Sequence, residues 1–172
     1  MKIFLLGYMC SGKSTLGPRL SGCLDIPFLD LDTEIEKAEG NSISRIFEEK
    51  GEEHFRRIEK TTLANLIRSV PDFVMATGGG TPCFFNNMEL MKKNGVTIYL
   101  DVPVKELVRR NIRTRERRPL LRRMSDLEMQ SFITSQLKER SVFYKKANKT
   151  MRDENPDLDL LEKEIRLMAH SR

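Results

Sequence analysis

Short runs of apolar residues alternate along this chain with longer segments in which apolar side chains recur at helical spacing. The short runs, rich in β-branched and aromatic residues, predict strands at 2–7, 27–31, 73–77, 96–101 and 149–152. The longer segments predict helices over 55–70, 127–144 and about 157–168. This alternation is typical of βαβ units around a parallel sheet. We therefore predict an α/β domain with helices on both faces of the sheet.

Composition agrees with a single folded domain over residues 1–172. The chain is 39% hydrophobic and 32% charged, and no repeat or low-complexity tract interrupts it. Turns are expected where glycine or proline separates the predicted elements, at Gly22, Gly51, Pro71, Gly95 and Pro103.

Positive charge is concentrated in one stretch. Residues 109–123 contain eight arginines and one acid, Glu116, whereas the whole chain has a net charge of only +5. Such a run suits the phosphates of a nucleic acid and also those of a small nucleotide. Nucleic-acid binding would favour aromatic residues interleaved for base stacking, and the run contains none, so we expect no nucleic-acid partner.

Other classes of protein are disfavoured. No apolar run reaches the roughly 20 residues that a membrane span needs, and the first residues lack a secretory pattern, so a cytoplasmic protein without a membrane partner is expected. Cys10, Cys23 and Cys83 are odd in number and widely spaced, which supports neither a disulfide framework nor a zinc site.

The first predicted strand leads directly into a phosphate-binding motif. Gly7, Gly12, Lys13 and Ser14 match G-x-x-x-x-G-K-S/T between a strand and a helix. Glycines let backbone N–H groups converge on phosphate oxygens, the lysine reaches the β- and γ-phosphates, and the serine hydroxyl binds magnesium. The Asp-x-x-Gly and Asn-Lys-x-Asp marks of a GTP switch are absent from the sequence, which favours ATP and Mg²⁺.

Three further stretches suit an acceptor site. Asp30 and Asp32 are two residues apart at the end of the second predicted strand, so we expect both side chains on one side of that strand, at the ligand-binding edge of the sheet. Arg56 and Glu59 share a helix face. The run 78–80, three glycines after the third strand, would let a ligand approach the backbone closely.

In these motifs the chain resembles the shikimate kinase family. The motifs that carry the resemblance lie in family order at 7–15, 28–36, 40–47, 51–59, 77–80, 118–121 and 139–144. The resemblance implies a P-loop NTPase-type three-layer fold with a five-stranded parallel sheet, a substrate-binding segment at about 32–62 and a lid at about 109–124. It also implies a monomer that transfers the γ-phosphoryl of MgATP to the 3-hydroxyl of shikimate.

The resemblance implies a role for each residue at a matching position. Lys13, Asp32 and Arg118 would be catalytic, with Asp32 binding the reacting hydroxyl as a base or an orienting acceptor, and Arg118 reaching the transferred phosphoryl from the lid. Ser14 and Asp30 would serve the metal, Asp30 through water. The nucleotide would contact Gly7, Cys10, Ser11, Gly12, Lys13, Ser14, Thr15, Arg118 and an adenine-side arginine, for which we favour Arg113 over Arg110. Shikimate would contact Asp32, Phe55, Arg56, Gly79, Gly80 and Arg140, with Glu59 fixing Arg56.

Some details depart from the family pattern. Cys10 stands where glycine is common, and Glu154-Asn155-Pro156 stands where an arginine can complete the adenine pocket. Arg109, Arg110, Arg122 and Arg123 are expected to form a solvated face or hinge contacts. The nearest alternative function is another P-loop kinase, of the gluconate or nucleoside-monophosphate type.

Overall fold

The computed structural model describes residues 1–114, 124–153 and 155–170, and its centre is a parallel sheet of five strands. The strands are β1 (Lys2–Leu6), β2 (Phe28–Asp30), β3 (Phe73–Ala76), β4 (Val96–Leu100) and β5 (Lys149–Met151). Their order in the sheet is β2-β3-β1-β4-β5, and all four neighbouring pairs are parallel. All five predicted strands are confirmed, each to within one or two residues at its ends.

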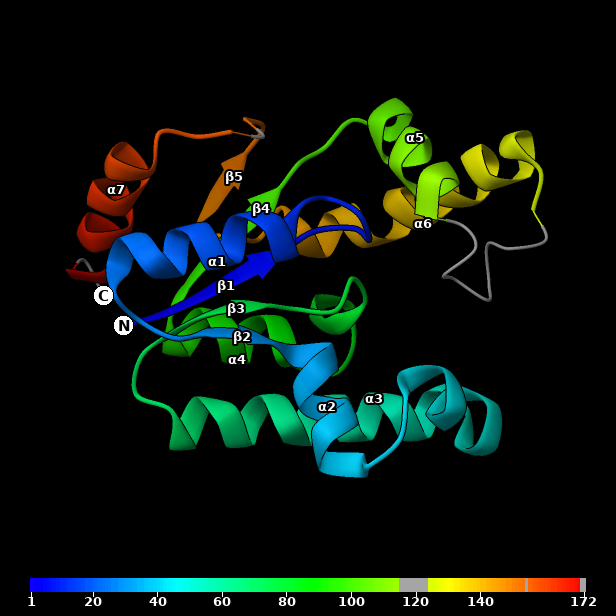
Figure 1. Cartoon of the computed structure of the whole chain (residues 1–172), viewed down its shortest axis with the longest axis horizontal. Helices are drawn as coiled ribbons and strands as arrows, with labels where there is room; N and C mark the ends of the chain where they lie inside the picture. Colours follow the sequence, from blue (N-terminus) through cyan, green and yellow to red (C-terminus); the bar gives the residue numbers. More distant parts are fainter. Residues whose placement is uncertain (115–123, 154, 171–172) are drawn as a thin grey trace.

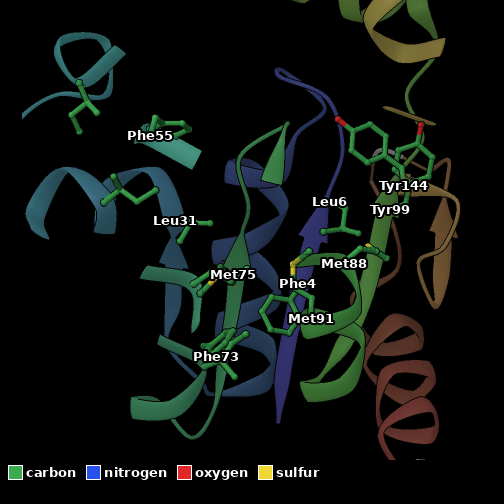
Figure 2. Packing of buried hydrophobic residues seen from close by; sticks show 14 residues of the cluster. Phe4, Leu6, Leu31, Phe55, Phe73, Met75, Met88, Met91, Tyr99 and Tyr144 are labelled. Carbon is green, nitrogen blue, oxygen red and sulfur yellow. The ribbon is translucent and has the colours of Figure 1, made fainter. Parts of the chain in front are cut away.

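Helices cover both faces of this sheet (Figure 1). They are α1 (Lys13–Leu24), α2 (Leu31–Glu39), α3 (Ile43–Ser69), α4 (Asn87–Asn94), α5 (Val104–Thr114), α6 (Asp126–Tyr144) and α7 (Leu158–His170), with a short 3₁₀ turn, η1 (Thr81–Cys83). Alternate residues of β1 enter different cores, because successive side chains of a strand point to opposite faces. Ile3 and Leu5 pack with α1 and α7, whereas Phe4 and Leu6 pack with α2, α3 and α4. Figure 2 shows the second core, in which Met88 and Met91 of α4 gather near Phe4 and Leu6.

Two local predictions are corrected. Gly22 lies inside α1, which continues to Leu24 and ends where Asp25 takes a left-handed conformation with φ 53°. Asp32 is not part of the second strand, because β2 ends at Asp30 and Asp32 lies in the first turn of α2. The expected turn at Gly51 appears as a break within α3, where the backbone has φ 79° and ψ 173°.

Gly95 and Gly22 form a matched pair for mutation, because one is tightly packed and the other lies in an open position of α1. A Cβ atom at Gly95 would lie 2.2 Å from the Lys2 carbonyl oxygen, whereas nothing lies within 4 Å of one at Gly22. We expect Gly95→Ala to lower the free energy of unfolding by roughly 2 kcal/mol. Gly22→Ala should raise it by about 0.5–1 kcal/mol, because alanine suits a helix interior better. Urea unfolding measures both changes, and destabilisation by Gly22→Ala would contradict its placement within α1.

Candidate active site

The loop between β1 and α1 forms a cradle for phosphate. Gly7 and Gly12 have φ 145° and 99°, and a Cβ at Gly7 would lie 2.7 Å from Ser11 Oγ. Lys13 is buried, and its Nζ donates to the carbonyl oxygens of Gly7 and Tyr8 at 2.8 and 2.9 Å. The N-cap of α1 makes no side-chain hydrogen bond, and its first turn contains no acid. The positive end of α1 therefore faces the loop with the amide donors and positive potential that an anion needs.

A cavity of about 520 Å³ lies over this loop. Cys10, Ser11, Gly12, Lys13, Ser14 and Thr15 all line it. Arg19, Arg110 and Arg152 add positive charge to its wall, and Arg110 Nη1 donates to the Cys10 carbonyl oxygen at 3.2 Å. Arg113, which we expected beside adenine, is exposed and is not among the lining residues. The cavity has the charge and the size for the phosphates of a nucleotide.

Ser14 and Asp30 meet at the edge of the sheet. The Ser14 hydroxyl donates to Asp30 Oδ2 at 3.2 Å, and the other carboxylate oxygen of Asp30 accepts from the backbone N–H of Asp32 at 3.1 Å. Mg²⁺ in phosphotransferases keeps several waters and takes few protein ligands. A hydroxyl and a carboxylate side by side next to the phosphate loop fit such an ion.

A second cavity, of about 660 Å³, lies between α3, α6 and the glycines after β3. All six residues predicted to contact the acceptor line it: Asp32, Phe55, Arg56, Gly79, Gly80 and Arg140. They come from four different elements, so only the tertiary fold brings them together. Asp32 is exposed to this cavity. It lies close enough to Lys13 of the phosphate loop for the positive charge of Lys13 to act on the pKa of Asp32.

The surroundings of Asp32 make it a stronger base than a free aspartate. Partial removal of water by the surrounding protein, together with the carboxylates of Asp30 and Glu59, raises the pKa of Asp32 to about 6, although the charge of Lys13 opposes the shift. The ionised form therefore prevails at neutral pH, while its affinity for a proton is higher than usual. Such a group can accept a hydrogen bond from an alcohol and take up its proton.

Arg56 is fixed inside the second cavity. Its Nη1 donates at 2.9 Å to Glu59, which is fully buried and also accepts a 2.5 Å hydrogen bond from Thr81 Oγ1. The Phe84 ring lies 4.1 Å from the guanidinium carbon. Glu59 thus fixes Arg56, as expected, and its bond to Thr81 connects both to η1. Phe84 and Thr81 carried no recognisable signal in the sequence, since both contacts depend on the turn after β3.

The three glycines are needed because side chains pack against their backbone. A Cβ at Gly80 would lie 2.6 Å from Arg56 Nη2, and one at Gly78 would lie 2.9 Å from Glu59 Oε1. The Gly79 carbonyl accepts a 2.5 Å hydrogen bond from the hydroxyl of Tyr144, which is buried beside Tyr99 (Figure 2). Tyr144 ends the same helix that places Arg140 in the cavity. The backbone of this turn is therefore held from both sides.

Part of the predicted site falls outside the residues that the structure describes. Arg118, most of the lid at 109–124 and Glu154 lie outside the described residues. Within the described residues, no helix has the length and apolar character to cross a membrane, and no group of three or more histidine, cysteine or acidic side chains could hold a metal ion by itself. The Mg²⁺ fit above depends on phosphate and water ligands instead.

A parallel sheet with a phosphate loop after β1, and an acceptor-sized cavity beside that loop, defines a P-loop fold of the small-molecule kinase class. The sequence model of the family described as SKI, shikimate kinase, matches residues 9–167. The chain therefore belongs to the shikimate kinase family.

Shikimate kinases from several bacteria match this chain in sequence and in structure over most of its length. The shikimate kinase of Parabacteroides distasonis is 43% identical over 149 residues, which cover 87% of this chain and 86% of that protein. The shikimate kinase of Flavobacterium johnsoniae is 40% identical over 92% of each chain. Two solved structures have the same fold. They are the shikimate kinase of Bacteroides thetaiotaomicron (TM-score 0.85, 35% identity, 99% and 97% of the two chains) and that of Acinetobacter baumannii in complex with shikimate (TM-score 0.83, 34% identity, 99% and 94%).

The raised pKa of Asp32 predicts a pH-dependent effect on stability. Because the folded-state pKa lies above the ordinary value, the protonated form is favoured on folding. The stability that it contributes is present below about pH 4 and is lost as pH rises through about 6. Asp32→Asn should therefore raise the free energy of unfolding at pH 8, by only about 1 kcal/mol because Asp32 is exposed to the cavity. Urea unfolding at pH 4.5 and pH 8 measures this gain, and an equal gain at both values would contradict the shift.

Proposed function

We propose that this chain is a kinase that transfers the γ-phosphoryl of MgATP to the 3-hydroxyl of shikimate, giving shikimate 3-phosphate. One observation supports this most strongly: Asp32, Arg56 and Arg140 line a single cavity that adjoins the phosphate loop. Shikimate is a small polyol acid. Arginines bind a carboxylate through planar pairs of N–H groups, and a carboxylate suits a reacting hydroxyl.

The proposed chemistry depends mainly on position and charge. Asp32 orients the acceptor hydroxyl and takes up its proton, for which its raised pKa is suited. Lys13 and the N–H groups at the start of α1 would bind the phosphates, and Ser14 and Asp30 would hold the metal, Asp30 through water. Bound Mg²⁺ would neutralise charge on the phosphate oxygens. Phe55, Gly79 and Gly80 complete the acceptor cavity, and Arg118 would reach the transferred phosphoryl from the lid.

The contacts of the α5 arginines support binding of a small nucleotide rather than of a nucleic acid. Arg109 and Arg110 both pair with Glu106 at 2.6 Å, and their hydrogen bonds lower the pKa of that carboxyl to about 2. Glu106 thus balances one of these two positive charges within the helix. Arg110 lines the cavity over the phosphate loop and Arg113 does not, so we propose Arg110 as the arginine on the adenine side. We propose a cytoplasmic monomer without a nucleic-acid or membrane partner.

An acceptor panel tests the proposed function. We expect ADP release in a coupled assay with shikimate, and only background release with gluconate, nucleoside monophosphates or no acceptor. Lys13→Ala should remove most of the activity, since it removes a charge that binds the phosphates. Turnover of gluconate or of a nucleoside monophosphate above that of shikimate would replace the proposal with another small-molecule kinase.

Arg140 allows a separate test of substrate binding. We expect Arg140→Ala to raise the KM for shikimate by about 10- to 100-fold and to change kcat much less, because a carboxylate far from the reacting hydroxyl is bound in ground and transition states alike. Lys138→Ala is the matched control, since Lys138 is an exposed cation of the same helix that does not line the cavity. An equal loss of kcat in Arg140→Ala would instead point to a role in the chemical step.

A further inference from the structure

Arg56 is bound by two glutamates of its own helix that differ in their surroundings. Glu59 is fully buried and fixed by Thr81, as described above. Glu52 accepts from the other side: Arg56 Nε and Nη2 both donate to Glu52 Oε1, at 3.2 and 3.0 Å. The Glu52 side chain is 57% exposed and lines the acceptor cavity. One carboxylate is therefore fixed in the protein, and the other can turn into solvent.

Glu52 occupies the edge of the guanidinium that a ligand carboxylate would use. The N–H groups of arginine lie in its plane, so a carboxylate binds at an edge and uses two of them together. The flat surface of Arg56 is covered, because the Phe84 ring lies over its central carbon and Gly80 packs closely against it. Glu59 takes a hydrogen bond from Nη1. The Nε–Nη2 edge, where a carboxylate could bind bidentately, is the edge that Glu52 contacts.

The backbone places Glu52 where its side chain can give way. Glu52 directly follows Gly51, whose φ of 79° and ψ of 173° break α3, so it begins the second helical segment. The Glu52 carboxylate can therefore move away from Arg56 in two ways, by rotation of its own side chain or by movement of the backbone at the Gly51 break. Arg56, by contrast, lies a turn further along and is 8% exposed.

We propose that Glu52 competes with the substrate carboxylate for Arg56 and thereby determines the affinity and charge selectivity of the acceptor cavity. Before the acceptor binds, Glu52 holds the guanidinium in its plane by accepting from Nε and Nη2. An acceptor with a carboxylate replaces Glu52, which turns into water, whereas a neutral acceptor cannot replace it. This inference rests on the proposed function, because it assumes that Arg56 binds the carboxylate of shikimate.

Glu52→Gln tests the competition, since glutamine has nearly the same shape without the charge. We expect the Kd for shikimate, measured by calorimetry, and its KM in the ADP-release assay to fall by about three- to tenfold. The neutral amide of shikimate should gain no affinity, because it never competed for the charge. Glu52→Ala should also lower the Kd, which separates the effect from any new hydrogen bond of glutamine.

Glu53→Gln is a closely matched control. Glu53 is the next residue of the same helix and pairs with Arg57, also four residues further on, but both are exposed and neither lines the acceptor cavity. The substitution changes net charge and the helix terminus in the same way, so we expect it to leave the Kd and KM unchanged. A similar gain in Glu53→Gln would mean that general electrostatics, and not competition, causes the effect.

The outcomes separate this inference from the proposed function. A Kd that rises or stays the same in Glu52→Gln overturns the competition, and a rise would make Glu52 a positioning residue for Arg56. An equal gain for the neutral amide overturns it as well. If the wild-type chain neither binds nor phosphorylates shikimate, the proposed function itself is wrong.

Discussion

The acceptor side of this structure depends on one buried carboxylate. Glu59 is fully removed from solvent, and a buried charge is costly unless it is paired and hydrogen-bonded. Arg56 supplies the opposite charge and Thr81 a hydroxyl donor. Removal of either partner would leave the charge only partly compensated, which costs more than the pair contributes. The position of Arg56 in the cavity is therefore a consequence of how Glu59 is accommodated.

The same carboxylate explains the backbone around it. Gly78 lies so close to Glu59 that a side chain there would strike it, and Gly80 lies as close to Arg56. Glu59 also contributes to the raised pKa of Asp32, together with Asp30, while Lys13 lowers it. The groups of the phosphate loop and those of the acceptor cavity thus act on one titrating residue. The two cavities form a single electrostatic unit at the carboxyl edge of the sheet, where ligands of open α/β sheets bind.

Much of this arrangement could be predicted from the sequence, because it depends on local patterns. Five apolar runs predicted the five strands, and the glycines and lysine of residues 7–13 predicted the phosphate loop. The errors occurred where the caps at the ends of helices, and not the apolar pattern, decide the boundary of an element. Asp30 ends its strand by capping α2, which no alternation pattern reveals, and Gly22 continues a helix because Asp25 takes the left-handed turn instead. The pKa of Asp32 depends on neighbours from several elements, which no single stretch of sequence encodes. The contact of Glu52 with Arg56, by contrast, follows the i,i+4 spacing of a helix.

Helix α5 shows how a residue outside the family pattern can be accommodated. Cys10 has φ 61°, a conformation that costs a residue with a side chain about 1 kcal/mol and would cost a glycine almost nothing. In exchange, its thiol lies 3.5 Å from Asn111 Oδ1 and 3.6 Å from Thr114 Oγ1, and its carbonyl accepts from Arg110. These contacts connect the phosphate loop to the last turn of α5, directly before the segment in which Arg118 lies. The strain at Cys10 is thus offset by contacts that fix the position of the helix that carries Arg110 into the cavity over the phosphate loop.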